Sequence, residues 1–454
     1  MIRRFAILAL TTLAACGASE TTRRAAPEIA LPPMRVFSQV KPVPPQHSNA
    51  LIARDFLDLV FELENGDPVP AFSRFDGPIT VAVGPDAPPT LGPDLDRLLA
   101  RLRAEARIDI RRVSAGDIAS ITVHPVTRKQ IQRVAPSAAC FVRPNVSGWS
   151  DYRARRNDPD TFWNLLRERR QMAIFLPRDV SPQEVRDCLH EEIAQALGPV
   201  NDVYRLSESI FNDDNFHVVL TGYDMLILKA YYDPALQSGM SRAQVASRLP
   251  AILARLNPSG GADGIAAPDP TNRAWVRAIN QATTQGHSRD RRRAAADQAL
   301  ALAKAFGAQD TRLAYTHYVY GLLNLSSDPG ASLNAFLAAG KIYQTRPNTA
   351  IQEAHVALQI AAFQLSAGRA ETALRLVDAN LPIVRQTEHA ALLSLFLLVK
   401  AETLEVLGKH DAAKPVQREA LAWARYGFGD ETEIRDRAAE ILEISPRSRE
   451  GDPV

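Results

Sequence analysis

The stretch "SPQEVRDCLHEEIAQALGPVND", residues 181–202, contains the residue types that could do chemistry. Glu191 and Gln195 are four residues apart, so on a helix their side chains share one face, and Glu192 lies beside them. Carboxylate and amide oxygens can hold a cation, and a neighbouring carboxylate can take a proton from a bound water. The spacing therefore predicts either a cation site with a general base or a polar helix face that hydrogen-bonds the neighbouring turn.

The flanking residues define the limits of the helix that positions these side chains. Ser181 is a good N-cap, Pro182 suits the first helical position, and Glu184 completes a capping box. The pair Gly198–Pro199 is a strong stop signal. We therefore expect a helix over 182–197. Its core-facing apolar stripe consists of Val185, Leu189, Ile193 and Ala196.

The spacing of the acidic and glycine residues suggests a relationship to zinc peptidases. In those enzymes two histidines one helical turn apart bind zinc, and the glutamate after the first is the general base. Metzincins extend this to H-E-x-x-H-x-x-G-x-x-H. Starting the pattern at His190 leaves Gly198 out of register, whereas starting it at Glu191 places Gly198 at the motif glycine. In that register the stretch resembles a metzincin motif without its histidines, and His190 projects about 100° around the helix from Glu191.

The resemblance implies a role for each position of the motif. Glu192 stands at the general-base position. The three ligand positions hold Glu191, Gln195 and Asn201, with Asp202 next to the last. Zinc binds neutral amides weakly, and such an oxygen set suits calcium or magnesium better, or no metal. Whether a divalent metal binds as a cofactor stays open at this point.

Two later segments extend the resemblance beyond the motif. "ESIFND" (208–213) is similar to the Ser-Ile-Met turn of the matrixin branch, with Phe211 at the methionine position. "YDMLILKAYYDP" (223–234) resembles the helix that follows in metzincins. The resemblance implies a metzincin-like α+β domain over 48–256. It is similar to an uncharacterised family of proteobacterial envelope proteins that carry an E-E-x-x-Q-x-x-G-x-x-N-D version of the motif.

Apolar periodicity predicts the other elements of this domain. The expected strands are 78–85, 108–114, 119–125, 139–144 and 172–178. The expected helices, besides the motif helix, are 48–64, 94–106, 223–236 and 241–256. This order predicts a mixed α+β domain with a mostly single sheet.

The C-terminal part of the chain has a helical pattern only. It follows "NPSGGADGIAAPDP" (257–270), whose Gly, Pro and Asp content marks a linker. The segments 368–384 and 408–424 are 40 residues apart, and each follows an alanine-rich helix. Such a period is typical of a helical solenoid. Residues 271–446 therefore resemble tetratricopeptide repeats with a longer period, the alternative is an irregular bundle, and 447–454 form a tail.

The N-terminus has the pattern of a targeting segment. "MIRRFAILALTTLAAC" combines two arginines, an apolar stretch too short to span a bilayer, and small residues before Cys16. This resembles the lipobox of bacterial lipoproteins, in which the cysteine is lipidated; a plain secretory signal is the alternative. Gly17 after the cysteine favours, in that family, the outer membrane, here facing the periplasm. Residues 1–15 are then a signal peptide, and 16–47 carry the lipid and a flexible tether.

Export would place the two remaining cysteines in an oxidising compartment. Cys140 and Cys188 are an even pair there, which favours a disulfide; two buried thiols are the alternative. A bridge between them would tie a sheet strand to the motif helix.

Charge and motif content limit the function further. The 53 Lys and Arg residues nearly balance 51 Asp and Glu residues, so nothing favours nucleic acid as a partner. The sequence predicts a cell-envelope lipoprotein that binds a polypeptide or envelope partner through its helical repeats, with a degenerate peptidase-like domain. The alternative is an active metal-dependent peptidase with Glu192 as general base, so its status as an enzyme stays open.

Overall fold

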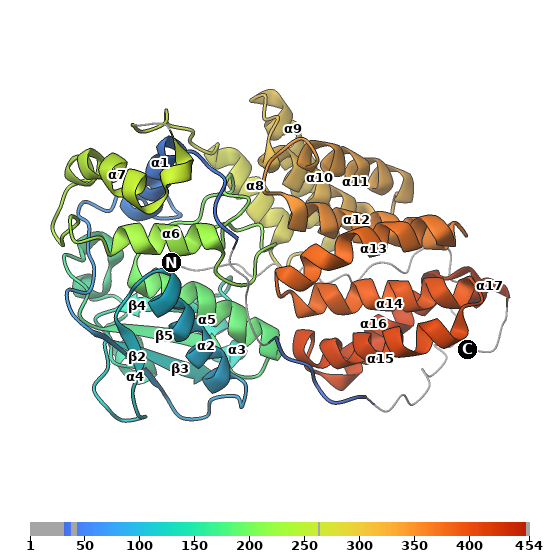
Figure 1. The fold of residues 1–454 in the computed structure, drawn as a ribbon, viewed down its shortest axis with the longest axis horizontal. Helices are drawn as coiled ribbons and strands as arrows, with labels where there is room; N and C mark the ends of the chain where they lie inside the picture. Colours follow the sequence, from blue (N-terminus) through green and yellow to red (C-terminus); the bar gives the residue numbers. More distant parts are fainter. Residues whose placement is uncertain (1–30, 38–42, 262–263, 451–454) are drawn as a thin grey trace. The chain divides into compact units, whose positions relative to one another are not determined.

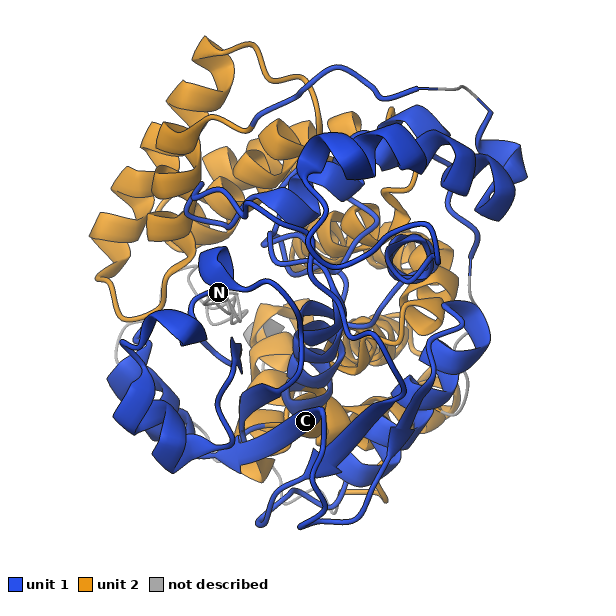
Figure 2. Ribbon diagram, turned by 90° about the vertical axis from the view of Figure 1, so that its left-hand side faces the viewer, with its two compact units in different colours: residues 1–5, 42–180, 184–270 blue, residues 6–41, 181–183, 271–454 orange. Residues whose placement is uncertain are grey.

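The computed structural model describes residues 31–37, 43–261 and 264–450, and they fall into two compact units. The first unit holds the described parts of residues 42–180 and 184–270 (Figure 2). The second holds those of 6–41, 181–183 and 271–454. Along the chain the units divide between Pro270 and Thr271, where the predicted linker ends. The predicted signal peptide and Cys16 lie outside the described residues.

The first unit, in which several strands are labelled in Figure 1, is built on a five-stranded sheet with strand order β2-β1-β3-β5-β4. Its strands are β1 (Ile79–Val83), β2 (Ile110–Arg112), β3 (Ile121–Val126), β4 (Phe141–Pro144) and β5 (Met172–Pro177). Neighbouring strands are parallel except β4, which runs antiparallel to β5 at one edge. This confirms the mixed α+β class. The edge strand β2 is shorter than predicted, since only its first residue is buried.

Alternating side chains divide the core between the two faces of the sheet. Met172, Ile174 and Leu176 of β5 pack into a large core, whereas Ala173 and Phe175 pack into a smaller one. The large core also includes apolar residues of α1 (Asn49–Phe61), α2 (Leu91–Glu105), α5 (Pro182–Leu197), α6 (Gly222–Tyr231) and α7 (Arg242–Leu256). The smaller core includes residues of α3 (Arg128–Val134) and α4 (Trp149–Arg155). Each fully buried Leu or Ile contributes about 1.5–3 kcal/mol.

Three single-turn 3₁₀ helices complete the first unit over the described residues. They are η1 (Pro159–Thr161), η2 (Trp163–Leu165) and η3 (Pro258–Gly260). The predicted linker 257–270 is anchored to α1 by several hydrogen bonds. The Asn49 amide donates to the Asn257 carbonyl at 3.0 Å, and the Ala266 backbone N–H donates to the Ala50 carbonyl at 2.9 Å. The described part of this segment therefore belongs to the fold of the first unit.

The second unit consists of helices, which pack as successive pairs. They are α8 (Arg273–Thr283), α9 (Arg289–Ala305), α10 (Thr311–Asn324), α11 (Pro329–Tyr343), α12 (Ala350–Ser366), α13 (Ala370–Gln386), α14 (Ala390–Val406), α15 (His410–Gly427), α16 (Glu431–Ile444) and α17 (Pro446–Glu450). The first helices of the pairs, α8, α10, α12 and α14, begin between 38 and 40 residues apart. This is helical-repeat character. The predicted tail begins instead with α17. No helix within the described ranges is long and apolar enough to cross a membrane.

Equivalent glycines end the first helices of two neighbouring pairs. Gly368 follows α12 with φ +73°, and Gly408 follows α14 with φ +69°. A left-handed residue at this position lets its own N–H and the next one satisfy the last helical carbonyls. Glycine adopts this conformation without steric cost, which explains why the turn recurs at the repeat period.

Part of the predicted flexible tether is instead docked in the second unit. The Arg35 backbone N–H donates to the Ala422 carbonyl of α15 at 3.1 Å, and the Phe37 ring stacks on Trp423 with centroids 4.3 Å apart. The prediction of a free tether is therefore wrong for residues 31–37. The amino-acid composition did not indicate this docking because the segment has too few apolar residues to show a periodic pattern. Its few large side chains nevertheless contact a folded helix.

Candidate functional site

The motif helix α5 spans Pro182–Leu197, the limits that its sequence predicted. Its apolar stripe is fully buried in the large core. The polar motif residues are buried too: Glu191 is 0% exposed, while Glu192 and Gln195 are each 1% exposed. Burying a carboxylate costs free energy unless neighbouring groups hydrogen-bond or neutralise it. The groups around these three side chains therefore decide what the site can do.

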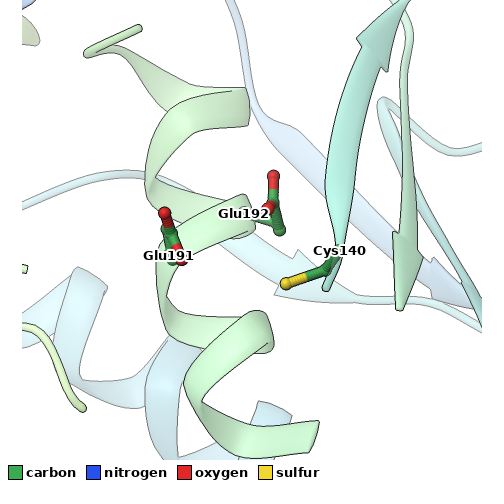
Figure 3. A group of neighbouring side chains, drawn as sticks. All are labelled: Cys140, Glu191 and Glu192. Carbon is green, nitrogen blue, oxygen red and sulfur yellow. The ribbon is translucent and has the colours of Figure 1, made fainter. Parts of the chain in front are cut away.

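The predicted general base lies beside the first predicted ligand. Oxygens of Glu191 and Glu192 and the Cys140 sulfur all lie within 4.8 Å of one another (Figure 3). The Gln195 amide donates to Glu191 Oε1 at 3.4 Å. No other trio of His, Cys, Asp or Glu side chains comes as close within the part of the chain that the structure describes. The compact group thus contains two of the predicted motif residues and one of the two cysteines of the predicted disulfide.

The cysteine of this group is bonded to a second cysteine on the motif helix. Cys140 precedes β4 and forms a disulfide with Cys188 of α5, with Cα atoms 6.0 Å apart. The bridge ties the edge strand to α5, as the sequence predicted. A sulfur in a disulfide is not a thiolate, and the thiolate is the form that binds metals. The compact group therefore offers a metal two carboxylates only.

Further carboxyl groups surround Glu191 from other segments. Glu64 lies in the turn after α1, where its carboxyl group lies close to that of Asp202 and feels the charges of Asp213 and Glu191. Burial above all, and then these like charges, raise the pKa of Glu64 to about 8. The nearby Asp202 carboxyl group acts in the opposite direction and lowers this pKa in part. We call Glu64, Glu191, Asp202 and Asp213 the acidic cluster.

The predicted third ligand faces a different part of the fold. The Asn201 side-chain nitrogen donates to the Asp58 carbonyl of α1 at 3.0 Å, next to a bond from the Val200 N–H to the Leu59 carbonyl at 2.8 Å. The Asn201 amide therefore fastens the loop after α5 to α1. Of the four candidate ligand positions, Glu191 and Gln195 are hydrogen-bonded to each other, Asp202 joins them through Glu64, and Asn201 serves as an anchor.

An ion-pair network fastens the same loop to α1. Arg205 donates to Asp55 Oδ1 at 2.6 Å and to Asp58 Oδ2 at 2.9 Å. The Tyr223 hydroxyl of α6 donates to the other Asp55 oxygen at 3.2 Å. Such charge-assisted bonds between partly or fully buried groups are stronger than neutral ones. The loop that carries Asp202 and Asp213 is thus held to α1 through Arg205, and α6 is bonded to the same Asp55 carboxylate.

The histidine next to the motif glutamates has a structural role. His190 is 4% exposed, and its Nδ1 accepts the Leu220 N–H at 3.2 Å. Burial, followed by the positive charges of Arg186 and Arg101, lowers the pKa of His190 well below its ordinary value. The neutral ring therefore links α5 to the chain before α6. It does not take the place of a metal-binding histidine, in agreement with its angular position on the helix.

The turn that the sequence aligned with a methionine turn is fixed by α6. Asp224 accepts from the Ser209 hydroxyl at 2.5 Å and from the Ile210 N–H at 3.2 Å. Burial raises the pKa of Asp224 to about 6 despite these bonds. Phe211, at the methionine position, is 0% exposed in the large core. An apolar side chain therefore fills this position, and the turn is rigid.

Two residues of the site could not be found in the sequence. Glu64 is 127 positions before Glu191, in a turn without any motif. Arg169 precedes β5 and donates to the carbonyls of Gln195 at 2.6 Å, Ala196 at 2.7 Å and Gly198 at 2.5 Å. Its guanidinium satisfies the free carbonyls at the end of α5 and complements the helix dipole. Neither residue shows a local pattern, because each acts through contacts made only in the folded chain.

The fold and the site define a mixed α+β domain with a buried acidic helix, followed by a helical-repeat unit. Residues 49–251 match a protein family described as "Protein of unknown function (DUF2927)", and the chain thus carries a DUF2927 domain over this range. The range includes all five strands, α5 and the acidic cluster. A search of curated proteins found no match.

Proposed function

We propose that this protein is a cell-envelope lipoprotein whose DUF2927 domain is a non-catalytic relative of the metzincins and binds a polypeptide partner. One observation carries the proposal: the Glu64 carboxyl group lies within electrostatic range of those of Glu191, Asp202 and Asp213, while Asn201, at a metal-ligand position, fastens the loop to α1. A site with carboxyl and amide groups where metzincins have imidazoles favours a positive charge without providing the ligands that zinc prefers.

The spacing of the carboxyl groups favours an organic cation over a metal ion. Metal–oxygen bonds are about 2.0–2.6 Å long, so the ligands of one ion crowd together. The acidic cluster contains no trio with oxygens within 4.8 Å of one another among the described residues. A lysine ammonium or an arginine guanidinium contacts carboxylates through hydrogen bonds of about 2.7–2.9 Å, which are longer than metal–oxygen bonds and let the carboxylates stand further apart. We infer that the cluster receives such a group from a polypeptide.

The remainder of the proposal concerns the envelope and the helical unit. The segment before Cys16 resembles a lipobox, which would anchor the protein to the membrane, at the outer membrane and facing the periplasm. The Cys140–Cys188 disulfide is consistent with an oxidising compartment. The helix pairs of the second unit suit tetratricopeptide-like repeats of a longer period, which commonly present a surface to a protein partner.

A metal-dependent peptidase is the second candidate. The closeness of Glu191 and Glu192 favours it, because Glu192 stands where a general base would act on a water bound by Glu191 and a metal. Gln195 would then be the second ligand and Asp202 the third. This candidate requires Asp202 to move from its place beside Glu64, since Asn201 is engaged by α1.

A pair of peptides tests the proposed binding role. The probe is a fluorescent lysine-containing peptide, and its lysine-acetylated form is the matched control without the charge. We expect acetylation to weaken binding about tenfold or more, and Asp213→Asn, which removes a carboxyl group of the acidic cluster, to weaken binding of the charged peptide by a comparable factor. Asp67→Asn, an exposed change in the turn of Glu64, should leave affinity unchanged. Equal affinity for the two peptides would overturn the proposal.

A further inference from the structure

The segment 31–37, "LPPMRVF", makes several specific contacts with α15. Phe37 stacks on Trp423, and the Arg35 guanidinium lies 3.1 Å from Glu419 Oε1. Two backbone groups take part: the Arg35 N–H donates to the Ala422 carbonyl, and the Pro32 carbonyl accepts from Arg425 at 3.1 Å. Leu31 packs against a small apolar cluster formed by Leu421, Ala424 and Ile434. We call Glu419, Ala422, Trp423 and Arg425 the α15 face.

The contacts alternate along the segment. Arg35 and Phe37 contact the α15 face, whereas Met34 and Val36 are 38% and 48% exposed. This is the period of an extended chain, in which successive side chains point to opposite sides. The α15 face therefore contacts every second residue of such a segment, and the intervening residues contribute little to binding.

The chemistry of the α15 face matches that of the segment. Glu419 also pairs with Arg385 at 2.8 Å and accepts from the Trp423 indole at 3.3 Å. Burial opposes ionisation of Glu419, but the hydrogen bond and charge of Arg385, the indole and Arg35 outweigh it and lower its pKa. A carboxylate held ionised beside an indole face recognises a basic residue followed by an aromatic one.

The segment is also well suited to bind without a large entropic cost. Pro32 and Pro33 restrict the chain to extended conformations before it docks. Much of its surface remains in water, including 55% of the Arg35 side chain. A segment that is held by a few contacts is among the least stable parts of a fold, and such segments detach most readily.

We propose that the α15 face is a binding surface for extended peptide segments with an arginine two residues before an aromatic residue, and that residues 31–37 are its resident occupant. A partner segment of the same pattern replaces them. The inference deepens the polypeptide-binding role proposed above, on which it rests, and it locates a second contact on the helical unit. Covalent linkage gives the resident segment a high effective concentration, so a partner binds measurably only when the segment is loosened or the partner is abundant.

The test titrates a labelled synthetic peptide of sequence LPPMRVF into the full chain. Phe37→Ala loosens the resident segment, so we expect the peptide to bind this variant about tenfold or more tightly than it binds the unaltered chain. Val36→Ala, the exposed neighbour, is the matched control and should behave like the unaltered chain. Glu419→Gln added to Phe37→Ala should weaken binding again, and circular dichroism checks that each variant is folded.

Variants of the peptide define which of its residues the α15 face recognises. Replacing the arginine or phenylalanine by alanine should abolish binding, and replacing the methionine or valine should not. Absence of binding to the Phe37→Ala chain, or equal binding to it and the unaltered chain, would overturn the inference. Asp213→Asn should not change this affinity, so a failure here is distinguished from a failure of the acidic cluster.

Discussion

The Arg169 guanidinium lies 2.6 Å from the Gln195 carbonyl oxygen, at the end of the motif helix. Its other bonds reach Ala196 and Gly198, and its charge lies 5.1 Å from the centre of the Trp163 ring. A residue from the segment before β5 thus fixes the end of α5. Arg169 thus helps to hold the motif helix in position.

Replacing Arg169 by alanine should strongly destabilise the first unit. The change leaves three carbonyls without their donor in a buried place, and each buried unsatisfied group costs about 1–3 kcal/mol. We expect a loss of about 3 kcal/mol or more in the free energy of unfolding, measured with urea. Arg170→Ala is the control, because the Arg170 side chain is 77% exposed and its loss should cost under about 0.5 kcal/mol. Equal effects of the two changes would contradict this account of α5.

Removing the disulfide should destabilise the same unit by a different route. Cys140 and Cys188 close a loop with a sequence separation of 48, so their bond restricts the unfolded chain. Replacing both by alanine should lower the free energy of unfolding by about 2–4 kcal/mol. A reducing agent should lower the stability of the natural chain by a similar amount and leave that of the double variant unchanged. A natural chain insensitive to reduction would argue against the bridge.

The acidic cluster should make stability depend on pH in a defined direction. The pKa of Glu64 is raised from 4.5 to about 8, so in the window between these values the unfolded chain has lost a proton that the folded chain keeps. The contribution of Glu64 to the free energy of unfolding is fully present below pH 4.5 and is lost as the pH rises through about 8. Glu64→Gln stays neutral, so its stability relative to the natural chain should increase across this window and level off above it.

Denaturation curves at several pH values test this difference. Asp67→Asn in the same turn should give a profile parallel to that of the natural chain. A parallel profile for Glu64→Gln would show that Glu64 is not held among like charges.

A second pH effect should arise from His190 on the acidic side. The pKa of His190 is lowered well below 6.5, so the unfolded chain gains a proton there before the folded chain does. The contribution of neutral His190 to the free energy of unfolding is therefore fully present above pH 6.5 and declines as the pH falls below this value. His190→Gln keeps an acceptor for the Leu220 N–H and should flatten this decline, whereas His410→Gln, at a side chain 60% exposed, should not. Thermal unfolding between pH 7 and pH 5 provides the measurement.

The sequence predicted the elements of the fold because their signals are local. Capping and stop residues gave the limits of α5, and apolar runs between turn residues gave the five strands. The recurring Gly turns gave the helix pairs of the second unit. These features need no knowledge of distant partners, since each depends on residues within a few positions of one another.

The site could be predicted only in part, because its remaining residues depend on tertiary contacts. The motif register that begins at Glu191 identified Glu191, Glu192 and Gln195, which are buried and lie next to one another. It could not indicate that Asn201 faces α1 or that Glu64 joins the acidic cluster from a distant turn. Similarly, nothing in the composition of residues 31–37 indicates that Trp423 is their partner. The metzincin resemblance and lipidation at Cys16 stay predictions.

The metal content of the purified protein tests the central claim most directly. The protein is prepared without a histidine tag, and its zinc, calcium and magnesium are measured by elemental analysis together with peptide cleavage before and after a chelator. Because the acidic cluster suits an organic cation, we predict less than one bound metal ion per chain and no cleavage with or without added divalent ions. One zinc ion per chain, removed by the chelator together with peptide cleavage, would contradict the account and establish the peptidase.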